Sequence, residues 1–96
     1  MIHLPEIKRV LQLLKPELNQ KYHVQTIGLF GSSVRDDFSA SSDVDILIEF
    51  NQPIGIEFID LANHIETKLN RKVDLVSRNG IKQKYYEAIE KEIVYV

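Results

Sequence analysis

The residues best suited to chemistry are a Gly-Ser turn and a pair of aspartates that follows it closely. The turn spans residues 31–35 with the sequence Gly-Ser-Ser-Val-Arg, and the acidic pair is Asp43 and Asp45. Glycine lets a backbone approach a ligand closely, and backbone N–H groups that open a helix favour anions. Two carboxylates side by side in an apolar strand repel each other, and a divalent cation between them removes that cost. The two features together indicate a site for a phosphate and a metal ion.

A third carboxylate, Asp74, lies in another apolar run, residues 73–76. If this run forms a strand beside the one that carries Asp45, Asp74 could join the pair on the same face of the sheet. A third carboxylate is what a two-metal phosphoryl-transfer site would need. It could bind the metal beside the attacking group and serve as the general base.

The Gly-Ser turn adds the groups that could hold phosphates. Gly31 and Ser32 sit where a strand gives way to a helix, and Arg35 lies about one helical turn further on, where it could reach a phosphate or a leaving pyrophosphate. The turn lacks the lysine of a Walker motif. Taken singly, each feature has a simpler explanation, such as a solvated strand end for the aspartates or a surface ion pair for Arg35. Their order along the chain favours the chemical interpretation.

Hydrophobic periodicity predicts the elements that carry these residues. A helical stripe starts near Pro5, and Pro16 predicts a kink or a break near Lys15, with residues 19–23 as a polar connection. Ser32 is a good N-cap, so a short helix is expected to begin there. Strands are expected over residues 24–30, 44–50, 72–77 and, at an edge, 94–96; helices around 58–69 and 85–89; and a loop over 36–42.

This order of elements predicts an α/β (α+β) fold, with a small mixed β-sheet flanked by helices, in one domain over residues 1–96. The helix between the second and third strands could make them parallel through a crossover, but the sequence alone leaves this open. The net charge of -2 argues against a general nucleic-acid-binding protein. The absence of cysteine excludes a disulfide scaffold and a thiolate metal site, and is compatible with the cytoplasmic location that we expect. No span approaches the length of a membrane helix.

The ordered motifs resemble the nucleotidyltransferase superfamily of the DNA polymerase β type. They are Gly31-Ser32, Arg35, the Ser42-Asp43-Val44-Asp45 segment and the later Val73-Asp74-Leu75 segment. The short length and the Leu29-Phe30-Gly31-Ser32 context look like its minimal nucleotidyltransferase branch. The resemblance implies that Gly31 and Ser32, with Arg35 and Ser42, bind the nucleotide, and that Asp43, Asp45 and Asp74 hold two Mg²⁺ ions. It further implies that Asp74 is the base.

Members of that branch are often antitoxins whose partner is a HEPN-domain ribonuclease toxin. The resemblance therefore implies transfer of AMP from ATP to a tyrosine of such a toxin. From the charge and the short apolar runs, we expect no direct binding of nucleic acid or membrane. Two alternatives stay open: an antitoxin that masks its toxin by stoichiometric binding, and a transferase for a small molecule of the aminoglycoside type. One departure is Asp36, because the residue after the motif arginine is often glycine in this branch.

Overall fold

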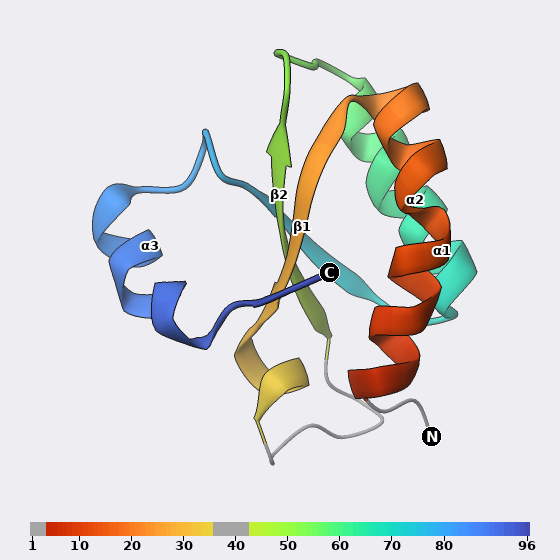
Figure 1. The fold of residues 1–96 in the computed structure, drawn as a ribbon. Coiled ribbons are helices and arrows are strands. Elements are labelled where there is room, and N and C mark those ends of the chain that lie inside the picture. Colours follow the sequence, from red (N-terminus) through yellow and green to blue (C-terminus); the bar gives the residue numbers. More distant parts are fainter. Residues whose placement is uncertain (1–3, 36–42) are drawn as a thin grey trace.

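The computed structural model describes residues 4–35 and 43–96, which form a four-stranded sheet with helices on both faces (Figure 1). The strands lie in the order β3-β2-β1-β4, so that β1 and β2 are central. The elements in chain order are α1 (Leu4–Tyr22), β1 (Val24–Phe30), the 3-10 helix η1 (Gly31–Val34), β2 (Val44–Phe50), α2 (Glu57–Leu69), β3 (Val73–Ser77), α3 (Gln83–Ile89), the 3-10 helix η2 (Glu90–Glu92) and β4 (Val94–Tyr95).

The sheet is mixed, which confirms the predicted fold class. Strand β1 runs antiparallel to β2 and to β4, whereas β2 and β3 are parallel. Two parallel neighbouring strands need a crossover connection, and helix α2 provides it here. This answers the question that the sequence left open, and it brings the start of β2 and the start of β3 to the same end of the sheet.

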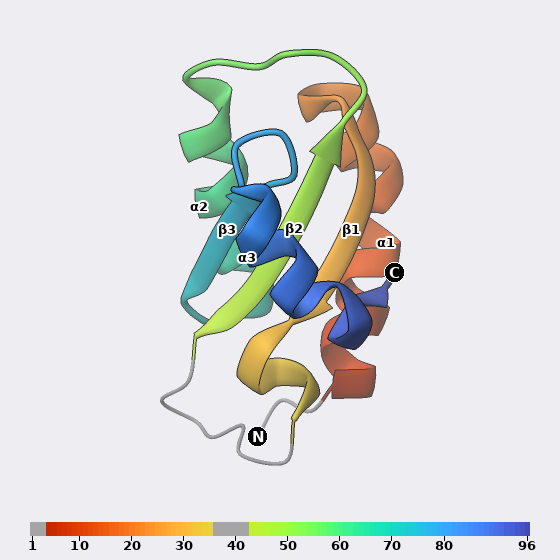
Figure 2. The ribbon, with the colours of Figure 1, turned by 90° about the vertical axis from the view of Figure 1, so that its left-hand side faces the viewer.

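The three α-helices divide between the two faces of the sheet. Helices α1 and α2 lie together on one face, and α3 crosses the other face (Figures 1 and 2). The main core lies under α1 and α2; its fully buried residues include Ile7, Leu11, Ile27, Ile46 and Ile65. A smaller cluster lies under α3, made of Phe30, Leu47 and Ile89. Alternate residues of the central strands thus serve opposite faces, as the pleat dictates.

Helix α1 passes through Pro16 without the predicted break. The helix is continuous to Tyr22, so the connection expected over 19–23 is also wrong for most of its length. Pro16 is exposed, and Leu18, two residues beyond it, is fully buried, so packing of the last turn outweighs the lost backbone hydrogen bond. His23 follows the last helical residue; it has a φ of 60°, and its N–H donates a hydrogen bond to the carbonyl of Asn19 at 3.1 Å.

The short helix after β1 begins one residue earlier than predicted. Gly31 is its first residue and Phe30 occupies the N-cap position, with no side-chain capping bond, so Ser32 is not the cap. The predicted loop over 36–42, which includes Asp36 and Ser42, lies outside the described residues. Among the helices of the described residues, none combines the length and hydropathy needed to span a membrane.

Candidate active site

The acidic residues predicted from the sequence lie at one end of the two parallel strands. Asp45 of β2 and Asp74 of β3 are direct register partners, so their side chains leave the same face of neighbouring strands about 4.8 Å apart. Asp43 lies just before β2, two positions from Asp45, and the strand alternation directs it to the same side. Asp43 and Asp74 are exposed, whereas Asp45 is half-buried between them.

The pKa of Asp45 reflects how close these carboxylates lie to one another. The pKa of Asp45 is raised above its ordinary value of 3.8, first by burial and then by the negative charges of Asp74 and Asp43. A hydrogen bond between the carboxyl groups of Asp45 and Asp74 raises it further, and the positive charge of Arg35 lowers it. Each carboxylate disfavours the ionised form of its neighbours, and a cation bound beside them would relieve this repulsion. The structure therefore brings Asp43, Asp45, Asp74 and Arg35 into one electrostatic neighbourhood.

The Gly-Ser turn packs directly on this acidic group. Phe30 pairs with Asp45 across β1 and β2, so the turn that begins at Gly31 starts beside Asp45. Gly31 is buried and has a φ of +71°, a backbone conformation that side chains rarely adopt. A β-carbon built on Gly31 would overlap the carboxylate oxygen Oδ2 of Asp45. Glycine is thus required at position 31 both for backbone conformation and for space.

The two serines of the turn differ in their surroundings. Ser33 is buried, and its hydroxyl donates a 2.9 Å hydrogen bond to the carbonyl of Phe30, which makes it a structural residue. Ser32 is half-exposed, and its carbonyl accepts the backbone N–H of Arg35 at 3.2 Å. Of the two, Ser32 is therefore the one whose side chain is accessible to a ligand.

A residue that the sequence did not single out also contacts the turn. The N–H of Gly31 donates a 3.1 Å hydrogen bond to the Oε1 atom of Glu92, which ends η2. No local sequence signal could have found this contact, because it joins residues that are 61 positions apart.

Whether this site can hold a metal ion depends on which of its side chains supply oxygen ligands. Among residues 4–35 and 43–96, no group of three or more His, Asp or Glu side chains forms a complete ion-binding cluster. Mg²⁺ in phosphoryl-transfer sites, however, is usually held by only one or two carboxylates, with water and substrate phosphates as the other ligands. Asp43 and Asp45 are hard oxygen donors on one side of β2, beside a turn suited to phosphate, so the donor set fits.

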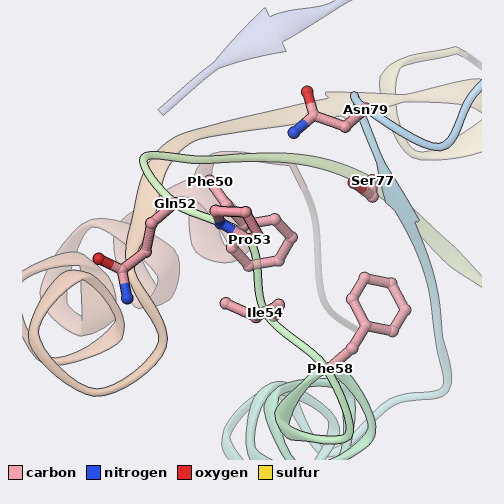
Figure 3. A pocket seen from close by; sticks show the side chains of 7 residues that line it. All are labelled: Phe50, Gln52, Pro53, Ile54, Phe58, Ser77 and Asn79. Carbon is pink, nitrogen blue, oxygen red and sulfur yellow. The ribbon is translucent and has the colours of Figure 1, made fainter.

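A separate pocket of about 260 Å³ lies at the other end of the sheet. Figure 3 shows its lining residues, which come from the end of β2, the following loop, α2 and the end of β3: Phe50, Gln52, Pro53, Ile54, Phe58, Ser77 and Asn79. Phe50 lies five residues beyond Asp45, about 16 Å along the strand. The pocket is therefore distinct from the acidic group, and it contains no titratable side chain.

Comparison with known proteins identifies the family. A family model described as "Nucleotidyltransferase domain" matches residues 11–96, which include every element from the second half of α1 onward. The chain belongs to the nucleotidyltransferase domain family. This confirms the resemblance inferred from the motifs, and the chain is accordingly a nucleotidyltransferase.

Two relatives match this nucleotidyltransferase over nearly its whole length. One is the protein adenylyltransferase MntA of Thermococcus cleftensis, 39% identical over 100% of this chain and 98% of its own. Another is a candidate protein adenylyltransferase of Methanocaldococcus jannaschii, 40% identical over 97% of each chain. Among solved structures, a candidate minimal nucleotidyltransferase has a TM-score of 0.81 at 22% identity and covers 97% of this chain and 95% of its own.

A second solved structure is a toxin–antitoxin complex with AMP-PNP. Its matching chain has a TM-score of 0.73 at 21% identity, and the match covers 98% of this chain and 72% of that one. A third is described as a tri-AMPylated HEPN toxin of Shewanella oneidensis in complex with its MNT antitoxin, with a TM-score of 0.66 at 21% identity, covering 93% of this chain and 66% of that one. At these identities the likeness establishes the fold.

Proposed function

We propose that this nucleotidyltransferase is an antitoxin that transfers AMP from ATP to a tyrosine hydroxyl of a HEPN-domain ribonuclease toxin. The observation that carries the proposal is the register pairing of Asp45 with Asp74 beside the Gly31 turn. It gathers the acidic groups and the turn at one end of the sheet. The names of the similar adenylyltransferases and toxin–antitoxin complexes favour a protein acceptor.

Asp43 and Asp45 would hold Mg²⁺, with Asp74 as a further ligand. When bound, Mg²⁺ neutralises phosphate charge and stabilises the transition state. Gly31 and Ser32, with Arg35 at the end of the turn, would bind the triphosphate, where the guanidinium of Arg35 offsets charge that develops on the leaving pyrophosphate. Ser42 would also contact the nucleotide, an assignment that rests on the sequence motif alone.

The reaction balances as a single displacement at phosphorus. The tyrosine oxygen forms a bond to the α-phosphorus of ATP, the bond from that phosphorus to the α,β-bridging oxygen breaks, and pyrophosphate leaves. Asp74 takes the phenolic proton. Its exposed position at an edge strand suits this role, because an acceptor carried by another protein must reach the base from outside.

The test uses labelled ATP, Mg²⁺ and the protein encoded by the neighbouring gene. Label on a tyrosine of that protein is the expected result, and an absence of label on any protein contradicts the proposal. The aminoglycoside-type alternative predicts label on a small molecule instead.

A second candidate, stoichiometric masking of the toxin, is favoured by two exposed apolar side chains that a partner could bury. Ile56 is 79% exposed and Ile59 60% exposed, close together at the start of α2. The two candidates separate in the variant that combines Asp43→Asn with Asp45→Asn, which leaves α2 unchanged. If this variant protects cells from the toxin as well as the wild type does, masking is the mechanism. Loss of protection with retained binding to the toxin assigns protection to catalysis.

A further inference from the structure

Glu92 contacts the Gly-Ser turn at the N–H of Gly31, whereas Asp45 lies where a β-carbon of Gly31 would be. The Oε1 atom of Glu92 accepts the N–H of Gly31 at 3.1 Å. A hydrogen bond from a backbone N–H to a carboxylate is charge-assisted and stronger than a neutral one. Gly31 thus lies next to two carboxylates. That of Asp45 occupies the space where a β-carbon would be, and that of Glu92 accepts the N–H of Gly31.

The register of the sheet explains why Glu92 reaches this turn. Strand β4 pairs antiparallel with β1, with Tyr95 opposite Gly28 and Val94 opposite Leu29. Continuing this register by two more residues places position 92 opposite position 31. The backbone leaves the ladder into η2 at this point, and the side chain of Glu92 supplies the acceptor that a continued strand would have supplied.

The backbone around Glu92 is anchored by its neighbour. Ile93 packs against the cluster of Phe30, Leu47 and Ile89, and Phe30 immediately precedes Gly31. Glu92 itself is half-buried, whereas Glu90 in the same 3-10 helix is exposed. Glu92 is therefore fixed by packing on one side and by the β4 ladder on the other, which gives its carboxylate a defined position.

We propose that Glu92 is a positioning residue, which fixes the Gly31 turn in the conformation that binds the triphosphate. The inference rests on the proposed function, because it assigns the turn to phosphate. It predicts that loss of the hydrogen-bond acceptor of Glu92 weakens nucleotide binding most, and that loss of its charge alone weakens binding less. The opposite mechanism is a gate, in which the negative charge of Glu92 competes with phosphate for the turn. A gate predicts tighter nucleotide binding when the charge is removed.

The experiment compares three variants of the full chain. Glu92→Ala removes the acceptor, Glu92→Gln keeps an acceptor oxygen but removes the charge, and Glu90→Ala is the matched control from the same helix. The first measurement is the hydrogen-exchange rate and chemical shift of the Gly31 amide by NMR. The second is the Kd of a non-hydrolysable ATP analogue with Mg²⁺, by calorimetry. Neither measurement needs an acceptor protein.

For Glu92→Ala we expect faster exchange at the Gly31 amide and a Kd that is about tenfold higher, as for the loss of one hydrogen bond to a charged acceptor. Glu90→Ala should stay within about twofold of the wild type. Glu92→Gln, which keeps a weaker neutral acceptor, should fall between Glu90→Ala and Glu92→Ala. An unchanged Gly31 amide, an unchanged Kd, or tighter binding in either Glu92 variant overturns the proposal.

A backup variant and an independent outcome keep the test decisive. If Glu92→Ala does not fold, Glu92→Asp shortens the side chain by one methylene and should shift the amide and the Kd in the same direction. If the wild type binds the analogue but labels no protein, the proposed function fails while the role of Glu92 is still tested. A loss of thermal stability in Glu92→Ala with normal binding and a normal Gly31 amide would make Glu92 merely structural and overturn the inference.

Discussion

Gly31 and Asp45 lie so close together that a β-carbon at Gly31 would overlap the carboxylate of Asp45. The turn at the end of β1 and the acidic group at the start of β2 are therefore in close contact. The β1–β2 pairing, which sets Phe30 opposite Asp45, holds them together. This close approach makes the glycine of the motif a spatial requirement of the acidic site.

Gly31→Ala should abolish nucleotide binding and also destabilise the fold. The new methyl group would displace Asp45, and alanine would be held at a φ of +71°, which costs roughly 1–3 kcal/mol. Urea unfolding and calorimetric titration with an ATP analogue measure the two effects. Gly80→Ala is the control, because its added β-carbon would meet its nearest atom at 3.9 Å. Equal stability of the two variants would contradict the argument.

Asp45→Asn should raise the stability of the protein in the absence of divalent cations while it abolishes transfer. The raised pKa of Asp45 means that its ionised form is disfavoured in the folded state by burial and by Asp74 and Asp43. After allowance for solvent screening, relief of about 0.5 kcal/mol should raise the Tm by ~2–4 °C at pH 7. Thermal unfolding in EDTA measures this difference.

The gain in stability of Asp45→Asn over the wild type should disappear at low pH. The penalty on wild-type Asp45 is complete above its raised folded-state pKa, shrinks as the pH falls through that pKa, and vanishes below the ordinary pKa of 3.8, where the carboxyl group is protonated in both the folded and the unfolded state. The Tm curves of the wild type and of Asp45→Asn should therefore converge on acidification. A constant difference from pH 7 to pH 4 would assign the effect to something other than charge.

Asp74→Asn should separate nucleotide binding from catalysis. Loss of a general base typically lowers the rate by 10²–10⁴-fold, so kcat should fall by about 100-fold or more. The Kd of an ATP analogue should change by less than about threefold, because the proposed site assigns the triphosphate to Gly31, Ser32 and Arg35. Single-turnover transfer and calorimetry measure the two quantities. A variant that transfers AMP at the wild-type rate would remove Asp74 from the role of base.

Gly28→Ala should loosen β4 and with it the contact of Glu92. A β-carbon at Gly28 would lie 2.6 Å from the Cγ2 atom of Ile93 and 3.3 Å from the Cε1 atom of Tyr95, so this edge must shift. Overpacking of this kind costs about 1–3 kcal/mol. The Gly31 amide should exchange faster in this variant than in the wild type. Gly55→Ala, at an exposed position, is the control.

The strand pattern could be predicted from the sequence because the apolar runs that end at Phe30 and Phe50 fill the core on both faces of the sheet. The pairing of Asp74 with Asp45 was predicted only on the condition that β3 neighbours β2, since no local pattern sets strand order. The continuation of α1 past Pro16 was missed for a similar reason. Leu18 is buried in the main core, together with residues of other elements, and tertiary packing overrides a local signal.

The contact of Glu92 could not be predicted at all. It depends on the register between β4 and β1, and two residues of strand carry too little pattern to fix a register. Likewise, the sequence indicated that Gly31 permits a tight turn, but its close approach to Asp45 follows from the β1–β2 pairing. Sequence reasoning thus finds which groups can do chemistry, and the pairing of strands decides which of them meet.

The order of the strands in the sheet also has a consequence for biosynthesis. Along the chain, the turn is made before β3, which carries Asp74, and Glu92 is made after both. Contacts of such wide sequence separation form late in folding, because their loop-closure entropy is lost before they contribute. A nascent chain that has reached β3 would contain all three aspartates and the Gly31 turn, but this turn would still lack its hydrogen bond to Glu92. The ability to bind nucleotide tightly should therefore arise only once η2 and β4 have also been made.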